Sequence, residues 1–496
     1  MKFYKRLLLL SGIFLFAACD TSETQGPDLV GGVIPPLPAD TPRVADPQLK
    51  GHLPRIIAHS DGTDLSKMTL WAMGLDGLRQ RVFDVGANAW GDWVIRGIPA
   101  DALYPPPDWD DLGEVLNVDA AYDKTRPHVA VSYSYTARRG RDSAKLALAS
   151  DEAPFGTTAG FTESSFGTSN WFDPVTSVSD EARQKFHLFG NWHRGGPNRP
   201  DERLVSVSFE VEADGEIKAL QAEPREMPPL IIDGSEVEVK PGPNSAVHVP
   251  VPTDGGSRPS QTFVFVKWKR SNEDGVALWH DDHQGNSGWL DLGVPLSNAA
   301  DIIGNPVAFT WYNGDLNRTS VNLFVVVRSG EGGGRAELYE RYWSVDGNTP
   351  VANIEHWAPW KSHGSPLWDP ADSSKGHFLE ADTDWRLTKA LTWSYQGVDR
   401  VNVFGIASPE LDRDGNQQPH RLVEYVWNGS VWSWGNPHPP PPSGLGVRTL
   451  SAAATQQNGD YRISVATRAD DGSILERYYL IDNSGWHGWY WNDLTD

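Results

Sequence analysis

Residues 400–441 read RVNVFGIASPELDRDGNQQPHRLVEYVWNGSVWSWGNPHPPP, and this stretch decides the fold. The run VNVFG at 401–405 alternates with a period of two, which is typical of a half-buried strand. Residues 422–427 predict a second strand. The tight-turn dipeptide Asn428-Gly429 follows, and residues 431–434 predict a third strand after it.

Residues 391–395 (LTWSY) predict a fourth strand upstream, so the stretch forms a four-stranded antiparallel meander. A single sheet of this kind cannot bury both of its faces, and it therefore needs copies to stack against. The copies are marked by the pattern Leu-x-Glu-x-x-Trp, which is clearest at Leu422, Glu424 and Trp427. Full or degenerate versions mark Leu78, Leu204, Leu338, Leu422 and Ile474, and the surrounding sequence marks two further units at Leu146 and Leu278, which gives seven anchor positions.

The spacing of these anchors predicts the architecture. It varies from 52 residues, between 422 and 474, to 84 residues, between 338 and 422. Such variation does not suit a solenoid of uniform rungs, but it suits a propeller, in which loops between the strands absorb insertions. We therefore expect an all-β chain with a single β-propeller of seven four-stranded blades over residues 55–496. Six or eight blades are the alternatives.

The amino terminus has the composition of a bacterial lipoprotein signal. Lys2, Lys5 and Arg6 precede an apolar run, which ends in the sequence FAAC at Cys19, the only cysteine of the chain. We expect residues 1–18 to be a signal peptide and Cys19 to be lipidated. Residues 19–54, rich in Pro, Gly, Asp and Thr, would be a disordered flexible tether. These features predict a protein of the bacterial cell envelope, anchored by lipid to a membrane on its periplasmic or surface face.

The net charge and the tryptophan content limit the classes of ligand that we expect the protein to bind. The net charge is −22 and the pI about 5.0, which argues against nucleic acid and anionic lipid head groups as ligands. The 22 tryptophans exceed what core packing ordinarily uses, because an indole is large and its N–H needs a partner. They suggest stacking against sugars, with packing between blades as the alternative explanation.

The pattern from Leu422 to Pro437 resembles the blades of bacterial seven-bladed propeller lectins of the PLL-like kind, and it is also similar to six-bladed fungal fucose-binding lectins. The resemblance extends over about residues 55–496 and is clear in the last three units. It implies pockets between adjacent blades that bind monosaccharides, notably fucose, through an arginine, a glutamate and stacking aromatic rings. By this resemblance the predicted sugar-binding residues are Arg328, Glu340, Glu424, Trp427, Trp432, Trp434, Arg468 and Glu476.

The sequence offers little for catalysis or metal binding. It contains no motif of a serine hydrolase, a phosphate-binding loop or a dinucleotide-binding fold. The histidines show no metal-ligand spacing, so we expect them to be scattered over surface and loops, with no metal or other cofactor: His187, His193, His280, His283 and His420. The predicted function is non-catalytic binding of glycans or glycoconjugates. The alternatives are an interaction scaffold for an envelope protein partner and a glycan-cleaving propeller enzyme.

Overall fold

The computed structural model describes residues 54–59, 67–74, 77–97, 118–122, 129–136, 144–150, 170–180, 184–194, 202–211, 217–219, 225–250, 259–270, 273–296, 300–313, 318–329, 336–345, 353–366, 389–395, 398–407, 420–435, 438, 441–442, 444–457, 460–482 and 485–495. The chain divides into the units Met1–Arg43 and Val44–Asp496, and every described residue belongs to the second unit. The predicted signal peptide, Cys19 and all of the predicted tether except Pro54 lie outside the described residues. Within the described part of the chain, no helix is both long and apolar enough to span a bilayer.

The first three sheets are antiparallel meanders in which strands adjacent in sequence pair with one another. Two short strands depart from this order, because β5 pairs with β3 and β13 with β11. The sheets comprise β1 (Arg55–His59), β2 (Lys67–Gly74), β3 (Gly77–Asp84), β4 (Ala89–Trp90) and β5 (Val94–Gly97); β6 (Val118–Tyr122), β7 (Val129–Thr136) and β8 (Ala144–Ser150); and β9 (Asn170–Asp180), β10 (Lys185–Arg194), β11 (Glu202–Val211), β12 (Ile217–Ala219) and β13 (Arg225–Glu226).

A two-stranded hairpin, β14 (Ile231–Ile232) and β15 (Ser235–Glu236), separates these sheets from four more. Each of the four has four strands in sequence order. They comprise β16 (Glu238–Val249), β17 (Gln261–Arg270), β18 (Glu273–Asp281) and β19 (Ser287–Gly293); β20 (Ala300–Asn313), β21 (Arg318–Ser329), β22 (Ala336–Val345) and β23 (Lys361–Ser362), with the 3-10 helix η3 (Ile354–His356) before β23; β24 (Lys389–Tyr395), β25 (Val398–Ala407), β26 (Arg421–Trp427) and β27 (Trp432–Trp434); and β28 (Val447–Gln457), β29 (Asp460–Ala469), β30 (Ile474–Asp482) and β31 (Gly485–Asp493).

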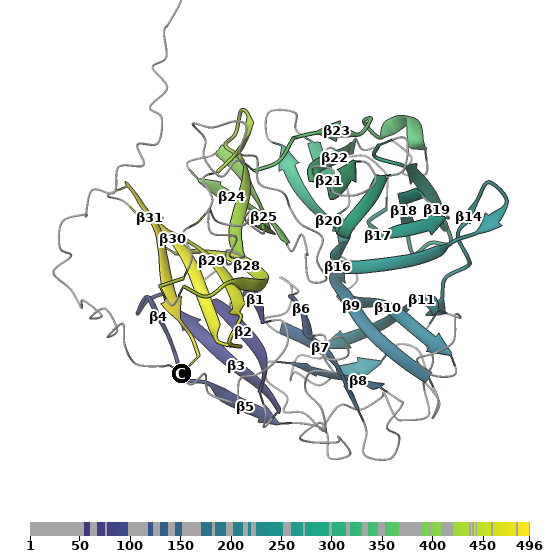
Figure 1. The fold of residues 1–496 in the computed structure, drawn as a ribbon. Helices are drawn as coiled ribbons and strands as arrows, with labels where there is room; N and C mark the ends of the chain where they lie inside the picture. The colour runs from purple at the N-terminus through teal and green to yellow at the C-terminus, as the bar shows by residue number, and fades with distance from the viewer. Residues whose placement is uncertain are drawn as a thin grey trace, which may run out of the picture. The chain divides into compact units, whose positions relative to one another are not determined.

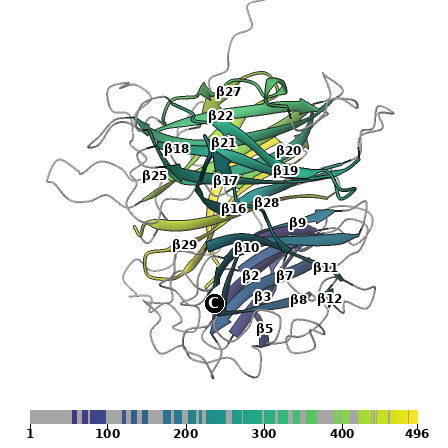
Figure 2. The same ribbon diagram turned by 90° about the vertical axis from the view of Figure 1, so that its right-hand side faces the viewer.

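The first strands of successive sheets contact one another and close a ring. Strands β1, β6, β9, β16, β20, β24 and β28 touch in this order, and β28 touches β1 again. In Figure 1 the yellow sheet of β28–β31 lies beside the purple sheet of β1–β5, and Figure 2 shows the same sheets from the side. A closed ring of antiparallel sheets is a β-propeller, so the predicted all-β fold class is confirmed.

The expected count of seven four-stranded blades is not confirmed. Six of the sheets have four or five strands, whereas the sheet of β6–β8 has three among the described residues. All seven sequence anchors nonetheless lie on the third strand of a sheet: Leu78 on β3, Leu146 on β8, Leu204 on β11, Leu278 on β18, Leu338 on β22, Leu422 on β26 and Ile474 on β30. The repeat therefore marks the third strand in each of these seven sheets.

The described parts of the stretch at 400–441 fold as the sequence predicts. Its strands are β25, β26 and β27, and β24 precedes them. The turn between β26 and β27 is the dipeptide Asn428-Gly429, where Gly429 has a φ of +100°. The side-chain oxygen of Asn428 accepts hydrogen bonds from the backbone N–H groups of Ser430 and Val431, both at 3.0 Å. A left-handed glycine and an Asx turn thus fix the hairpin.

The core lies between neighbouring sheets. One cluster joins buried side chains from three consecutive sheets, including Phe324 of β21, Phe404 of β25 and Val465 of β29, all 0% exposed. Burying one such phenylalanine contributes about 2–3 kcal/mol. Since each sheet gives its apolar faces to its two neighbours, the stability of the ring depends on the side chains at the interfaces between sheets.

Candidate functional site

Two cavities lie at one interface between sheets, that of β9–β13 with β16–β19. The large cavity has a volume of about 260 Å³ and is lined by Arg203 of β11, Glu236 of β15 and Trp289 of β19, among others. The small cavity has a volume of about 60 Å³, and its lining includes His187 of β10 and His283. Met227, which follows β13, lines both cavities. We therefore treat the two cavities as one candidate site.

The large cavity combines an apolar wall with a charged one. Leu204, Met227 and Leu230, at most 6% exposed, belong to the core cluster against which Trp289 packs. On the charged wall, Nη1 of Arg203 lies 2.5 Å from Oε1 of Glu236, with side-chain exposures of 33% and 52%. An ion pair exposed to this extent contributes little to the free energy of unfolding. Arg203 and Glu236 can therefore give up their contact with each other and bind a ligand instead at little cost in stability.

Local structure holds these side chains in place. The indole Nε1 of Trp289 donates a hydrogen bond to the backbone oxygen of Pro228 at 2.7 Å, and the ring packs edge to face on Trp279 with centroids 5.2 Å apart. Glu236 stands on the β14–β15 hairpin, whose turn is Asp233-Gly234 with φ values of +48° and +79°. Two positive φ angles are typical of a type I′ hairpin. None of the three residues Arg203, Glu236 and Trp289 is among the sugar-binding residues predicted from the sequence.

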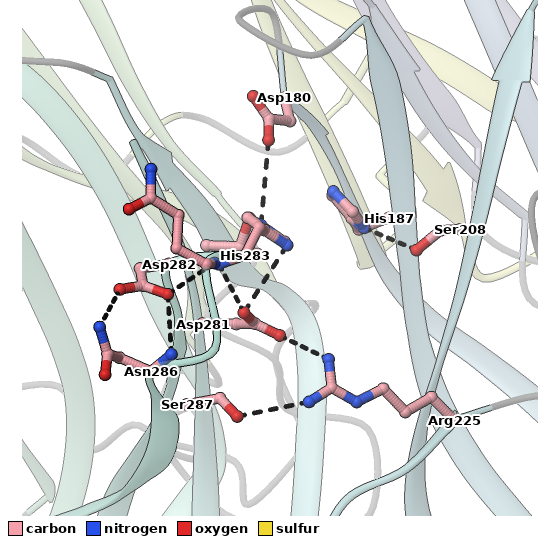
Figure 3. A network of polar contacts seen from close by, with 11 residues as sticks. Asp180, His187, Ser208, Arg225, Asp281, Asp282, His283, Asn286 and Ser287 are labelled. Carbon is pink, nitrogen blue, oxygen red and sulfur yellow. Dashed lines mark hydrogen bonds and ion pairs between the residues drawn. The ribbon is translucent and has the colours of Figure 1, made fainter. Parts of the chain in front are cut away.

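A polar network surrounds the small cavity (Figure 3). Arg225 donates to Oδ2 of Asp281 at 2.7 Å and to Oγ of Ser287 at 3.3 Å. The other carboxylate oxygen of Asp281 accepts the backbone N–H of His283 at 2.7 Å. The network fixes the turn after β18 and places the His283 ring beside His187, with ring centroids 4.7 Å apart and planes 16° apart.

Asp282 stabilises the same turn. It accepts hydrogen bonds from the backbone N–H groups of Gln284 and Asn286 and from the side-chain amide of Asn286, at 2.6–3.0 Å. Burial alone would raise the pKa of Asp282, but these hydrogen bonds outweigh it and hold the pKa below its usual value. Asp282 is therefore a structural carboxylate of the turn.

The repeat glutamates occupy one equivalent position at three other interfaces. Glu340 is 4% exposed; its carboxylate accepts the amide of Asn322 at 2.5 Å and lies 2.8 Å from Nε2 of His363. The Nδ1 atom of His363 in turn lies 2.6 Å from the hydroxyl of Tyr425 on the next sheet. Glu340 thus belongs to a buried chain of polar groups that joins two sheets.

Glu424 and Glu476 repeat this arrangement. Asn402 donates to Glu424 at 3.1 Å, and the hydroxyl of Ser464 donates to Glu476 at 2.5 Å. Asn322, Asn402 and Ser464 hold the same place in the repeat, on the second strand and two residues before the register partner of the glutamate. This partner is not among the predicted site residues, although the matching runs VNLF at 321–324 and VNVF at 401–404 contain it.

The predicted arginines, Arg328 and Arg468, do not lie opposite the repeat glutamates in the strand register. Arg328 lies opposite Ala336, whereas Glu340 lies opposite Phe324, four residues earlier on β21. Four residues of strand amount to about 13 Å, so the structure does not bring Arg328 and Glu340 together. Arg468 lies opposite Ile474. The arginine that contacts Glu476 is Arg462, with Nη2 and Oε2 2.8 Å apart.

The predicted tryptophans of the 400–441 stretch pack at the interface between the sheets of β20–β23 and β24–β27. Trp432 stacks on Tyr425 with ring centroids 5.1 Å apart and planes 2° apart, and Trp434 donates its indole N–H to the backbone oxygen of His363 at 2.9 Å. Trp427 packs edge to face on Trp311. All three indoles are half-buried, and the two cavities described above lie at a different interface. Their contact with a sugar remains a prediction.

Fold and site together define a β-propeller with a cleft of ligand size between two of its sheets. No family model and no curated protein matches the chain. Similar solved structures include Trypanosoma rangeli sialidase in complex with the inhibitor DANA, with a TM-score of 0.44, 11% identity and coverage of 74% of this chain. AofleA from Arthrobotrys oligospora has a TM-score of 0.36 and 11% identity, covering 90% of this chain and 87% of its own. An ulvan lyase of a new polysaccharide lyase family has a TM-score of 0.34 and 11% identity, covering 90% and 82%.

The chain spans about half the length of the sialidase, 55% of it. Because every one of these TM-scores is below 0.5, the likenesses do not decide a function.

Proposed function

We propose that this protein binds carbohydrate without catalysis, and that the large cavity between the sheets of β9–β13 and β16–β19 takes one sugar ring. The observation that supports this proposal most directly is that Trp289 and the partly exposed Arg203–Glu236 ion pair line the same cavity. A volume of about 260 Å³ is just below the range of about 300–1,000 Å³ typical of pockets for drug-sized ligands. The size therefore suits a monosaccharide rather than a long oligosaccharide segment.

The chemistry of the lining suits a sugar. A pyranose has an apolar face of C–H groups that packs on an indole, and Trp289 with Leu204 and Leu230 supplies an apolar surface. Its hydroxyls need charged or polar partners that replace water. The carboxylate of Glu236 accepts from hydroxyls and the guanidinium of Arg203 donates to hydroxyl or ring oxygens, which gives stronger hydrogen bonds than neutral partners do.

The identity of the sugar and the number of sites belong to the same proposal. The blade pattern at 422–437 resembles that of fucose-binding propeller lectins, so fucose and its methylated forms are the first sugars to test. Weak sites at several blade interfaces would gain affinity by acting together on a glycan surface. We include a seventh blade, built on β6–β8, in this proposal, since Leu146 marks the repeat there.

We also propose that the protein is a lipoprotein of the bacterial envelope, tethered through Cys19 and residues 19–54. The basic residues before the apolar run and the sequence FAAC at 16–19 support this. Growth of the producing bacterium with a radiolabelled fatty acid should label the wild-type chain and leave Cys19→Ser unlabelled. Equal labelling of both chains would contradict the proposal.

A glycan array tests the function. The full chain should bind a restricted set of glycans that share one terminal sugar, and the same sugar added free should displace it. Hydrolysis or elimination of a bound glycan would instead establish an enzyme. Absence of any glycan binding, together with a stoichiometric protein partner recovered from envelope extracts, would establish the interaction scaffold.

A further inference from the structure

A buried carboxylate and two imidazoles meet beside the small cavity. Asp180 is the last residue of β9, His187 lies on β10 of the same hairpin, and His283 lies in the turn after β18. One potential ligand atom from each of the three residues lies within 4.8 Å of the other two. The residues come from positions 180, 187 and 283, so only the packing of two neighbouring sheets brings them together (Figure 3).

We propose that Asp180, His187 and His283 bind a divalent transition-metal ion of the zinc class. Two imidazoles and one carboxylate form a ligand set that zinc accepts, and a tetrahedral zinc takes a fourth ligand from water. The small cavity, about 60 Å³, has room for that water, whose share of liquid volume is about 30 Å³.

The burial of these three side chains favours the binding of a cation. Asp180 is 0% exposed, His187 is 6% exposed, and the side chain of His283 is 17% exposed. Burying an ionised carboxylate is costly, and a bound cation offsets more of that cost than neutral partners do. Nitrogen ligands favour zinc and its transition-metal neighbours over magnesium or calcium, which prefer oxygen.

The polar groups near the Nδ1 atoms of His187 and His283 are of the kind that orient metal-binding histidines in proteins. A metal-bound imidazole ordinarily donates its other ring N–H to a carboxylate, a carbonyl or a hydroxyl. The Nδ1 atom of His187 lies 2.8 Å from the hydroxyl of Ser208, which leaves Nε2 as the ligand atom. The Nδ1 atom of His283 lies 3.7 Å from Asp281, and Arg225 fixes that carboxylate.

The backbone at His283 is held by the turn after β18. This residue has a φ of +56°, which few residues other than glycine adopt. The hydrogen bond from its N–H to Asp281 holds the conformation. Backbone conformations of this kind persist where the surroundings impose them, and they concentrate at binding sites.

The ion requires the three side chains to close on it and the two nearly parallel imidazole rings to turn, because a ring nitrogen binds a metal in the plane of its ring. Zinc–nitrogen distances of about 2.0–2.1 Å place tetrahedral ligand atoms about 3.3 Å apart, so the three side chains must close by at most about 1.5 Å. Thr262, whose hydroxyl lies 3.0 Å from Nε2 of His283, would give up that contact. The competing arrangement needs no metal: His248 and His283, 3.7 and 3.9 Å from Asp180, would then act as its ion-pair partners.

Zinc binding by the full chain, without a histidine tag, decides between the two arrangements. We expect wild type to take up one equivalent of zinc in titration calorimetry and in competition with a coloured chelator. His283→Ala should weaken binding at least about 100-fold, and Ser208→Ala about 10-fold, because groups behind the ligands contribute about 10–100-fold. His356→Ala, which changes an exposed histidine of η3, should bind zinc as wild type does.

Circular dichroism checks that the variants fold. Should His283→Ala not fold, Ser208→Ala carries the test, because it changes one hydroxyl behind a ligand. Cobalt bound in place of zinc should give the visible absorption of a four-coordinate site, and His283→Ala should abolish it. Failure of wild type to take up stoichiometric zinc, or equal affinity in wild type, His283→Ala and Ser208→Ala, would overturn the proposal in favour of the metal-free ion pairs.

Discussion

Trp90, in the first sheet, donates the N–H of its indole to Oε2 of Glu476 in the last sheet, at 2.9 Å. The same carboxylate oxygen lies 2.8 Å from Nη2 of Arg462, and Glu476 is 0% exposed. The two sheets also meet where Arg81 and Trp93 donate to the backbone oxygen of Leu494. Side-chain contacts between the first and the last sheet therefore hold the ring closed, and Glu476 is central to these contacts.

Glu476→Ala should destabilise the protein strongly. The change leaves the guanidinium of Arg462 buried without its carboxylate, and breaking a buried ion pair in this way costs about 3–5 kcal/mol. Chemical denaturation followed by circular dichroism measures the free energy of unfolding. Glu273→Ala, an exposed glutamate at the start of β18, is the control and should change it by less than about 0.5 kcal/mol. Equal stabilities of the two variants would show that the closure does not depend on Glu476.

Glu424 gives the protein a pH dependence. Burial raises its pKa to about 7 from an ordinary 4.5, since the side chain is only 12% exposed. The folded state therefore holds this proton more tightly than the unfolded chain does. The stabilisation is complete below about pH 4.5 and is lost as the pH rises to about 7. Burial acts oppositely on His438, lowering its pKa to about 3, so its contribution is lost as the pH falls below about 6.5.

Glu424→Gln isolates the first of these effects. The amide stays neutral, so at pH 8 the variant should exceed wild type in free energy of unfolding by about 3 kcal/mol, and at pH 5 by less than about 1 kcal/mol. Denaturation of both proteins at the two pH values measures the difference, with Glu273→Gln as the control. A difference that does not grow between pH 5 and pH 8 would refute the raised pKa.

Glu340→Ala separates the two roles considered for the repeat glutamates. Its carboxylate bonds with Asn322 and His363 inside a buried network, so we expect a loss of about 3 kcal/mol of stability. Glu337→Ala, on the same strand, removes an exposed hydrogen bond from Ser362 and a contact with Tyr339, and should cost about 1 kcal/mol. Loss of a sugar site from Glu340→Ala with stability unchanged would instead establish the glutamate as a ligand group.

The sequence predicted the repeat better than the site. Period-two strands and the Asn428-Gly429 turn are local features, and all seven anchors fall on third strands because each unit repeats the same local pattern. Which arginine meets a glutamate depends on strand register, and Arg462 rather than Arg468 does so at Glu476. Arg462 and Arg468 are six residues apart on β29 and so share one face of the strand, and the alternation of side chains does not distinguish them.

Contacts between neighbouring sheets could not be predicted from the sequence for a further reason. Arg203, Glu236 and Trp289 come from three separate strands, and His187 and His283 lie 96 positions apart, as 283 − 187. No spacing rule connects such residues, because the loops between sheets vary in length. The turn dipeptide Asp233-Gly234 indicates the hairpin that presents Glu236, but not the wall that this hairpin faces.

The most direct test of the proposed function is the affinity of the large cavity for the sugar that the array identifies, measured by titration calorimetry. Trp289→Ala should weaken binding at least about 30-fold, the loss of about 2 kcal/mol expected when a central aromatic contact is removed. Trp360→Ala is the matched control, since that half-buried indole also donates to a backbone oxygen, that of Leu292, outside the cavity. We expect weak binding by Trp289→Ala and wild-type binding by Trp360→Ala; wild-type affinity in folded Trp289→Ala would contradict the proposed function.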